Sequence, residues 1–295
     1  MGVPVLLRAP TSEPDRYESA LRDKSFYPFS LPVLETVLHV HKLKNIIAQE
    51  PADSHAISGV IVTSARAAEA WGRAVDELLE DRDHDLRGWH QDWSQIPFYT
   101  VGPSTASILA SLSGSPASST NTRSRLCPRD IRGVDSGNAE RLARFILEDV
   151  ASSASQSLLY LTGDKNRDTL PNIIHNEGHN NVTLREEQVY DTVGVNLDTF
   201  DHNVIHATTG IHTTEPWWIV FFAPSSAAHV LSVLPRHFQL PTTTNTWNSG
   251  VYRARIASIG PTTADALRNK HNLAVAVVSP EPNADALAEA LAGVV

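Results

Sequence analysis

The sequence predicts an α/β protein made of two similar doubly wound domains, each built on a parallel sheet. Short apolar strands alternate with amphipathic helices, and this alternation repeats in the same order along the chain. Such alternation is typical of a parallel sheet with helices on both faces. The length, 295 residues, suits two domains of ordinary size better than one.

Four pairs of segments carry the repeat. The first pair joins an apolar strand, a Ser-containing turn and an Ala-rich helix, and the second has the pattern strand-Gly-Pro-hydroxyl-Thr-Ala. The third is a helix that follows an Asn, and the fourth is a short strand ending in Thr-Val. In chain order the pairs are 59–71 with 218–231, 98–109 with 256–267, 137–146 with 282–291, and 32–37 with 188–193. Four pairs in one order indicate an internal duplication.

The chain therefore divides into four successive units, 1–37, 59–146, 158–193 and 218–291. The first opens on an apolar strand in MGVPVLLRAP, and the third opens on a similar strand in LLYLTG. The spacing between the copies shortens after the second pair, which indicates about a dozen extra residues in the first copy. We place them in a flexible surface insertion at 112–125. The repeat alone leaves open whether the first unit joins the second or the fourth.

Composition excludes several classes of protein. The net charge of −9 argues against nucleic-acid binding, and we interpret Arg123, Arg125, Arg129 and Arg132 as a solvated insertion in a loop. No apolar run approaches the roughly 20 residues that span a bilayer. The N-terminus lacks the pattern of a signal peptide, which predicts a cytoplasmic protein.

Metal binding and thiol chemistry are not expected. The single cysteine, Cys127, cannot form an intramolecular disulfide, and no thiolate-activating residues surround it in the sequence. The thirteen histidines lack the spacing of a zinc site, with His39 and His41 expected on one face of a strand. We predict no metal.

Four turns that follow predicted strands carry hydroxyl residues, and ligands bind parallel sheets at this end of the strands. The pairs are Thr63-Ser64, Ser104-Thr105, Ser225-Ser226 and Thr262-Thr263. Any one of them could simply be a helix N-cap, since Ser and Thr are preferred caps. Their recurrence in both copies favours a second role, because helix N-termini bind carboxylates or phosphates. Arg66 could add a bidentate contact to such an anion.

Tyr190 differs from its counterpart in the first copy. It lies in QVYDTV, where the matching segment PVLETV has Leu34. A tyrosine where the repeat needs only an apolar residue suggests a task beyond packing, although strands favour tyrosine in any case. Motifs for nucleotide binding and serine hydrolysis, GxxxxGK[ST], GxGxxG and GxSxG, are absent.

Taken together, these segments resemble the uroporphyrinogen-III synthase family. The matching pieces are VIVTSARAAEA (60–70), YTVGPSTA (99–106), SGNAERLA (136–143), LYLTGDKNRDTLP (159–171), VYDTV (189–193), FFAPSSA (221–227) and IASIGPTTADAL (256–267). They occur in the family's order over nearly the whole chain. A departure is Ala223, where many relatives have Ser or Thr.

The resemblance implies one domain from 1–38 plus 196–295 and a second from 43–188, with linkers at 39–42 and 189–195. The segments LPVLET (31–36) and VYDTVG (189–194) would be the two connecting strands. The active site would be the cleft between the domains. The implied substrate is hydroxymethylbilane, a linear tetrapyrrole with eight carboxylates. The enzyme closes it with loss of water and inversion of ring D, in heme biosynthesis, without a cofactor.

The resemblance also implies residue roles. Tyr190 would help the terminal hydroxyl leave. The carboxylates would be bound by Ser64, Arg66, Ser104, Thr105, Ser225, Ser226, Thr262 and Thr263. We expect a monomer, with transient contact with the preceding pathway enzyme as a further option. The competing interpretation is a non-catalytic two-domain protein that binds an anionic metabolite, since fold alone does not fix function. Tyr190 distinguishes the two, because a pure binder needs no acid.

Overall fold

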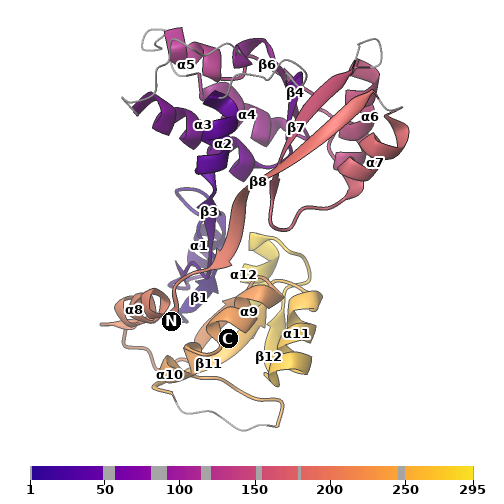
Figure 1. Ribbon diagram of the computed structural model, residues 1–295. Coiled ribbons are helices and arrows are strands. Elements are labelled where there is room, and N and C mark those ends of the chain that lie inside the picture. The colour runs from indigo at the N-terminus through magenta and orange to yellow at the C-terminus, as the bar shows by residue number, and fades with distance from the viewer. Residues whose placement is uncertain are drawn as a thin grey trace. The chain divides into compact units, whose positions relative to one another are not determined.

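The structure is a computed structural model that describes residues 2–48, 57–80, 92–113, 121–150, 155–178, 181–244 and 250–294 (Figure 1). The chain forms two compact units. The terminal unit comprises Met1–Glu35 with Val193–Val295, and the middle unit comprises Thr36–Thr192. Each unit contains a sheet whose core strands are parallel, with helices on both faces, so the predicted fold class is confirmed.

The middle unit has the strand order β8-β7-β4-β5-β6, all parallel. These strands are β4 (Gly59–Val62), β5 (Pro97–Thr100), β6 (Asp130–Arg132), β7 (Gln156–Gly163) and β8 (Val182–Gly194). One face packs against α2 (Val40–Ala48), α3 (Ala65–Glu80), α4 (Pro103–Ser111) and α5 (Asn121–Leu126). The other packs against α6 (Ala139–Val150) and α7 (Thr169–Glu177). Strands β4 and β7 are buried runs of apolar residues because both of their faces are covered.

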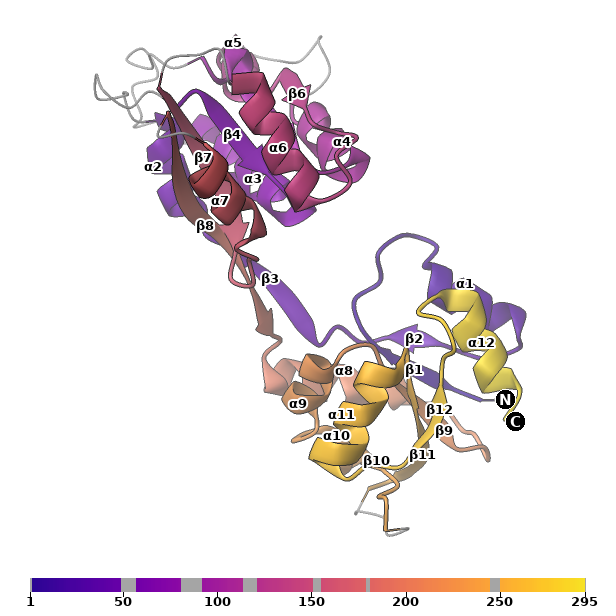
Figure 2. The ribbon, with the colours of Figure 1, turned by 90° about the vertical axis from the view of Figure 1, so that its right-hand side faces the viewer.

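The terminal unit repeats this order as β2-β1-β9-β11-β12, again parallel. The strands are β1 (Pro4–Leu7), β2 (Phe29–Ser30), β9 (Trp217–Phe221), β11 (Tyr252–Ser258) and β12 (Val275–Val278), and β10 (Phe238–Gln239) pairs with the start of β11. Helices α1 (Arg16–Asp23) and α12 (Ala284–Ala292) cover one face side by side (Figure 2). The other face carries α8 (Leu197–Thr208), α9 (Pro224–Val230), α10 (Leu234–His237) and α11 (Pro261–His271).

Sheet pairing resolves which copies join. Strand β1 from the first sequence unit pairs with β9 from the fourth, and β7 from the third pairs with β4 from the second. The chain passes between the units in β3 (Leu34–Leu38) and β8, which are neighbours. Their hydrogen bonds, from His39 N to the Val189 carbonyl and from Val195 N to the Val33 carbonyl, show that they run antiparallel.

Trp71 fixes α3 against the sheet of the middle unit. Its ring is fully buried and meets the rings of Trp93 and Phe98 edge-on, with centroids 5.0 and 4.9 Å away. Its indole N–H donates to the Leu126 carbonyl at 3.0 Å. Edge-to-face contacts and a satisfied N–H stabilise a buried tryptophan. The start of α3, which carries Ser64 and Arg66, is therefore attached to a rigid core.

Two expectations about the polar segments are wrong. Residues Asn121–Leu126 form α5, and Arg132 lies in β6, so the arginines do not share one loop. Arg123 and Arg132 make ion pairs with Asp76 and Asp149, at 2.7 and 2.6 Å, which hold these short elements in place. Residues 114–120 of the predicted insertion lie outside the described residues. His39 and His41 do not share a strand face, because α2 begins at Val40.

Cys127 packs in the core of the middle unit. Cys127 is buried, and burial raises the pKa of its thiol to about 11, so the thiol stays protonated near neutral pH. Within the described residues, no helix is both long and apolar enough to cross a bilayer.

Asp15 makes the stability of the terminal unit depend on pH. It caps α1 and accepts hydrogen bonds from the N–H groups of Thr11, Tyr17 and Glu18. The Arg8 guanidinium donates to both carboxylate oxygens of Asp15 at 2.9 Å. Burial alone would raise the pKa of Asp15, but these hydrogen bonds outweigh it and the pKa lies below its usual 3.8.

We therefore expect Asp15→Asn to lower the free energy of unfolding by about 1–3 kcal/mol at pH 7. A lowered folded-state pKa stabilises the protein above the unfolded-state value and stops doing so as pH falls through the folded-state value. The difference between wild type and variant should therefore shrink below pH 3.8. Urea unfolding at pH 7 and pH 3 measures it. Asp285→Asn, at an exposed first-turn residue of α12, is the control. An Asp15 effect that does not change with pH would contradict the assignment.

Candidate active site

Five of the nine predicted site residues lie along one edge of the middle sheet. Strands β5, β4, β7 and β8 are consecutive neighbours and parallel, so their carboxyl ends share this edge. Three of these strands carry the set: β5 leads to Ser104 and Thr105, β4 leads to Ser64 and Arg66, and β8 contains Tyr190. This is the edge at which parallel sheets bind ligands.

Tyr190 lies directly over a glycine. A Cβ added to Gly163 would fall 2.6 Å from the Tyr190 hydroxyl oxygen and closer still to Cζ. The ring is half-buried and packs against the core on the α3 side, while the Arg66 guanidinium carbon lies 5.8 Å from its centroid. The Tyr190 ring therefore packs directly against Gly163, with the Arg66 guanidinium beside it.

An irregularity in strand pairing aims this side chain. Strands β7 and β8 pair residue for residue up to Thr162 with Gln188, but Gly163 then pairs with Tyr190. Val189 is the extra residue, and both Val189 and Tyr190 contact the same core cluster, although strand neighbours normally point to opposite faces. Such a β-bulge redirects a side chain, and bulges are common beside active sites.

Arg66 and Lys165 supply positive charge at this edge. Both side chains are exposed. Arg66 Nη1 donates to Thr192 Oγ1 at 3.1 Å, and Lys165 Nζ donates to the Thr192 carbonyl at 3.4 Å. Lys165 also lies 3.7 Å from Asp164, whose other oxygen accepts from the Thr192 N–H. Among the described residues, no carboxylate forms an ion pair with Arg66.

Lys165 and Tyr160 also lie at this edge and were not among the predicted site residues. The Tyr160 hydroxyl donates to Asn166 Oδ1 at 2.9 Å and lies 3.4 Å from Thr63 Oγ1, so it links the ends of β4 and β7. Burial raises the pKa of Tyr160, with the hydrogen bonds to Thr63 and Asn166 acting against that rise. Lys165 could have been found from its position in the sequence, because it directly follows the end of a predicted strand, as the hydroxyl pairs do. Tyr160 lies inside an apolar run and gives no such signal.

The terminal unit has its own set at the corresponding edge. Strands β9 and β11 are parallel neighbours, with Phe221 paired to Ser258. They lead to Ser225 with Ser226 and to Thr262 with Thr263, respectively. The structure therefore brings these four residues to one edge of the terminal sheet.

Of the four hydroxyl-bearing turns, one provides a helix N-cap through its hydroxyl side chain and three do not. Ser64 Oγ accepts from the Ala67 N–H at 3.2 Å, so Ser64 caps α3. In the other three turns the N-cap is Gly102, Ala223 or Gly260, none of which makes a side-chain cap bond, and proline follows it. The hydroxyl pair then occupies the second and third helical positions, where the second member is buried and the first is more accessible. The pairs are Ser104 with Thr105, Ser225 with Ser226 and Thr262 with Thr263.

This placement leaves the first N–H groups of α4 and α11 without a cap side chain. Helix N-termini attract anions through these N–H groups and the helix dipole. The exposed hydroxyls of Ser104 and Thr262 stand beside them as further donors. Each edge can therefore hold carboxylates without a cluster of basic residues.

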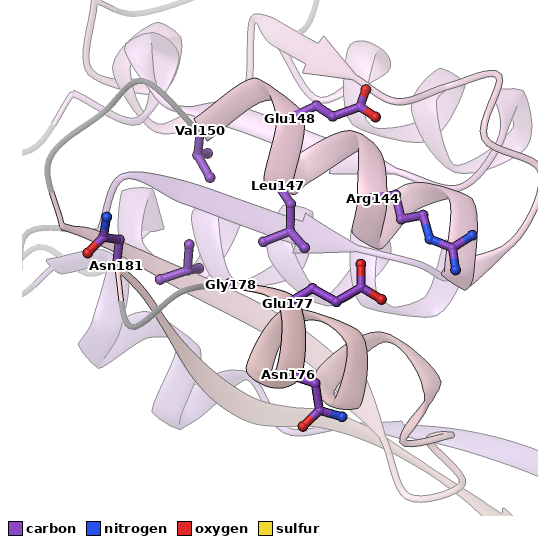
Figure 3. Close-up of a pocket in the computed structure, with 9 residues that line it drawn as sticks. Arg144, Leu147, Glu148, Val150, Asn176, Glu177, Gly178 and Asn181 are labelled. Atoms are coloured by element: carbon purple, nitrogen blue, oxygen red, sulfur yellow. The ribbon is translucent and has the colours of Figure 1, made fainter.

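A pocket elsewhere in the middle unit is distinct from this edge. It is lined by the last turns of α6 and α7 and the start of β8, including Leu147, Glu148 and Glu177 (Figure 3). These elements meet at the amino ends of the strands. No predicted site residue lines the pocket. The described residues contain no group of three side chains placed to hold a metal ion.

Comparison with known proteins gives one consistent family. The family model for uroporphyrinogen-III synthase HemD matches residues 15–289. The chain is 27% identical to uroporphyrinogen-III synthase of Saccharomyces cerevisiae, covering 97% of this chain and 94% of that protein. It is 28% identical to that of Schizosaccharomyces pombe, covering 99% and 96%. A solved mutant uroporphyrinogen III synthase from the bacterium Thermus thermophilus matches with 13% identity and a TM-score of 0.41, over 99% of this chain and 97% of that chain.

Proposed function

This chain belongs to the uroporphyrinogen-III synthase HemD family, and from that premise we propose how its residues carry out the reaction. A uroporphyrinogen-III synthase is a cyclising lyase of tetrapyrrole biosynthesis, and the homologues support this function over simple metabolite binding. The proposed substrate is hydroxymethylbilane. The observation that supports the proposal most strongly is Tyr190, set by a bulge over Gly163 beside Arg66 at a ligand-binding edge.

The first chemical step needs a proton at the leaving hydroxyl. We assign it to the phenol of Tyr190, which donates directly or through a water while the C–O bond breaks and water departs. The resulting azafulvene is attacked by the substituted carbon of ring D, and the spiro product fragments and recloses with the ring inverted. The tyrosinate then recovers a proton from solvent or from the pyrrole carbon that loses one. Atoms balance with water as the only product besides the macrocycle.

Holding one geometry is the larger part of the task. The free bilane closes spontaneously to the uninverted type I isomer, so the protein must bring ring D to the bond-forming distance in the other orientation. Positioning of this kind can supply much of a rate enhancement. The substrate has eight carboxylates that the protein can bind. We propose that they are bound by the exposed hydroxyls, the helix N-termini and Arg66.

The protein's net charge of −9 makes this form of binding necessary. A highly anionic substrate would be repelled by the protein as a whole, so attraction must come from local donors. Lys165 adds to Arg66 at the middle edge. Ala223 offers no hydroxyl, and the neighbouring Ser225 and Ser226 are the proposed contacts at that turn.

The functional domains proposed from the family, 1–38 with 196–295 and 43–188, remain a proposal, as do the monomeric state and the transient contact with the preceding enzyme. The absence of a cofactor and the cytoplasmic location also remain predictions.

A coupled assay tests the function. Freshly generated hydroxymethylbilane is supplied to purified protein, the products are oxidised, and the type I and type III isomers are separated. A dominant type III product supports synthase activity. Only type I, formed at the rate without protein, would contradict it and favour the binding-protein alternative.

Arg66 is expected to act on substrate binding. Arg66→Ala should raise KM by about tenfold with a smaller change in kcat, because one exposed charge-assisted contact to a carboxylate is lost. Arg66→Lys should recover part of the loss, since it keeps the charge but not the bidentate geometry. The same assay at several substrate concentrations measures this. Arg73→Ala, an exposed arginine of α3 that pairs with Glu77, is the control. An unchanged KM in Arg66→Ala would remove Arg66 from the carboxylate contacts.

A further inference from the structure

The bulge that aims Tyr190 is fastened by side chains outside the predicted site. His39 Nε2 lies 2.8 Å from Asp191 Oδ2, and Gln188 Nε2 contacts the other oxygen, Asp191 Oδ1. The contact between Gln188 and Asp191 spans the two residues at which the strand is irregular. Both carboxylate oxygens of Asp191 are thereby occupied.

The backbone of the bulge is held by the same residue. The carbonyl of the extra residue, Val189, accepts from the N–H of His39, the residue directly after β3, at 2.8 Å. His39 therefore binds the bulge twice, through its backbone to the residue before Tyr190 and through its ring to the residue after it. On the other side, the Asp164 N–H donates to the Tyr190 carbonyl at 3.2 Å. The main chain at residues 189–191 is fixed from both neighbouring strands.

We propose that His39 and Asp191 form a positioning pair for Tyr190, which sets the bulge and so keeps the phenol over Gly163. This inference rests on the proposed role of Tyr190. The Tyr190 ring packs on the α3-side core and over Gly163, and the pair binds the residues on either side of Tyr190. It acts through the backbone, because a shift of one residue in strand register turns every following side chain to the opposite face.

The pair can set the bulge without stabilising the whole unit. The side chains of His39 and Asp191 are 39% and 30% exposed, so the pair contributes little to global stability. Because the pair lies beside the bulge, we expect it to act on the local pairing of β8 and not on the sheet as a whole. Loss of the pair should therefore change where Tyr190 points while hardly changing the free energy of unfolding.

The test combines rates of type III formation with a double-mutant cycle. His39→Ala and Asp191→Ala should each lower the rate roughly tenfold, and together no further, because they remove one interaction. His39→Gln should stay within about twofold of wild type, since its amide can donate where the imidazole Nε2 does. In a Tyr190→Phe background, His39→Ala should have no additional effect.

Lys42→Ala is the matched control. Lys42 pairs with Glu187 at 3.4 Å and so, like His39, links the segment after β3 to β8, but Glu187 lies in the regularly paired part of the strand. This variant should leave the rate unchanged. An equal loss in Lys42→Ala and His39→Ala, or an equal effect of His39→Ala with and without the Tyr190 hydroxyl, would overturn the inference.

A second readout does not depend on activity. In protein with ring-¹³C-labelled tyrosine, the Tyr190 signal, assigned by its loss in Tyr190→Phe, should shift in His39→Ala and remain in place in Lys42→Ala. An unmoved signal in His39→Ala would overturn the positioning role even if Tyr190 is catalytic. A shifted signal with full type III activity in Tyr190→Phe would instead show that the proposed role of Tyr190 has failed while the pair still sets its geometry.

Discussion

Tyr190→Phe should lower the rate of type III formation by about 10²-fold, the lower end of what a general acid contributes. The variant removes the hydroxyl and keeps the ring that packs on the core and over Gly163. Type I should then increase as a share of product, because spontaneous closure continues while the enzymatic route slows. The isomer ratio at fixed enzyme concentration measures this, together with single-turnover rates that separate chemistry from product release.

Tyr160→Phe is the control for Tyr190→Phe. It removes a second phenol at the same edge, one that is committed to Asn166 and lies near Thr63. Tyr160→Phe should lower the free energy of unfolding by about 1 kcal/mol, because one hydrogen bond is lost, and should leave the isomer ratio unchanged. Undiminished type III formation by Tyr190→Phe, with a loss in Tyr160→Phe, would transfer the acid role to Tyr160.

Much of the architecture can be predicted from the order of apolar runs, turns and helices in the sequence. The strands VIV of β4 and WWIVF of β9 are uninterrupted apolar runs, and each is followed by a turn and a helix, so pattern alone predicts a parallel sheet covered on both faces. The pairing of β1 with β9 and of β7 with β4 joins segments some 100 to 200 residues apart in the sequence. No local pattern specifies such pairing, and the repeat by itself allowed two solutions.

The site could be predicted in part for a similar reason. Hydroxyl pairs after strands mark the proposed ligand-binding edges, but their chemistry depends on the residue at which the following helix begins. Ser64 is a cap because α3 begins at Ala65, whereas Ser104 is not because Pro103 begins α4 and Gly102 is the cap. Proline is favoured at the first helical position, and this detail turns a capping residue into an exposed donor.

Residues whose role depends on tertiary contacts gave no signal in the sequence. Gly163 looks like an ordinary strand end, and His39 looks like one of many histidines. Their roles follow from a single extra residue in β8 relative to β7, which appears only once the two strands are paired. Periodicity of two along β8 would place Val189 and Tyr190 on opposite faces, and the structure places both against one core cluster.

Gly163→Ala should approach the loss expected for Tyr190→Phe, about 10²-fold in the rate of type III formation, while leaving the phenol in the protein. The added methyl would overlap the Tyr190 ring, at 2.6 Å or less from three of its side-chain atoms. The ring is half-buried and can swing away, so the clash displaces the side chain more readily than it unfolds the strand. The loss should appear in kcat more than in KM, because the proton donor moves while the carboxylate contacts stay.

Gly293→Ala is the matched control, because its added methyl meets its nearest neighbour at 3.6 Å, an ordinary contact far from either edge. Circular dichroism and thermal unfolding should show both variants folded, with Gly163→Ala destabilised by about 1–2 kcal/mol at most. Combining Gly163→Ala with Tyr190→Phe should give little more loss than either alone, since both remove the same donated proton. Full activity in folded Gly163→Ala would mean that the chemistry does not depend on the phenol lying over residue 163. In that case the bulge would serve packing alone.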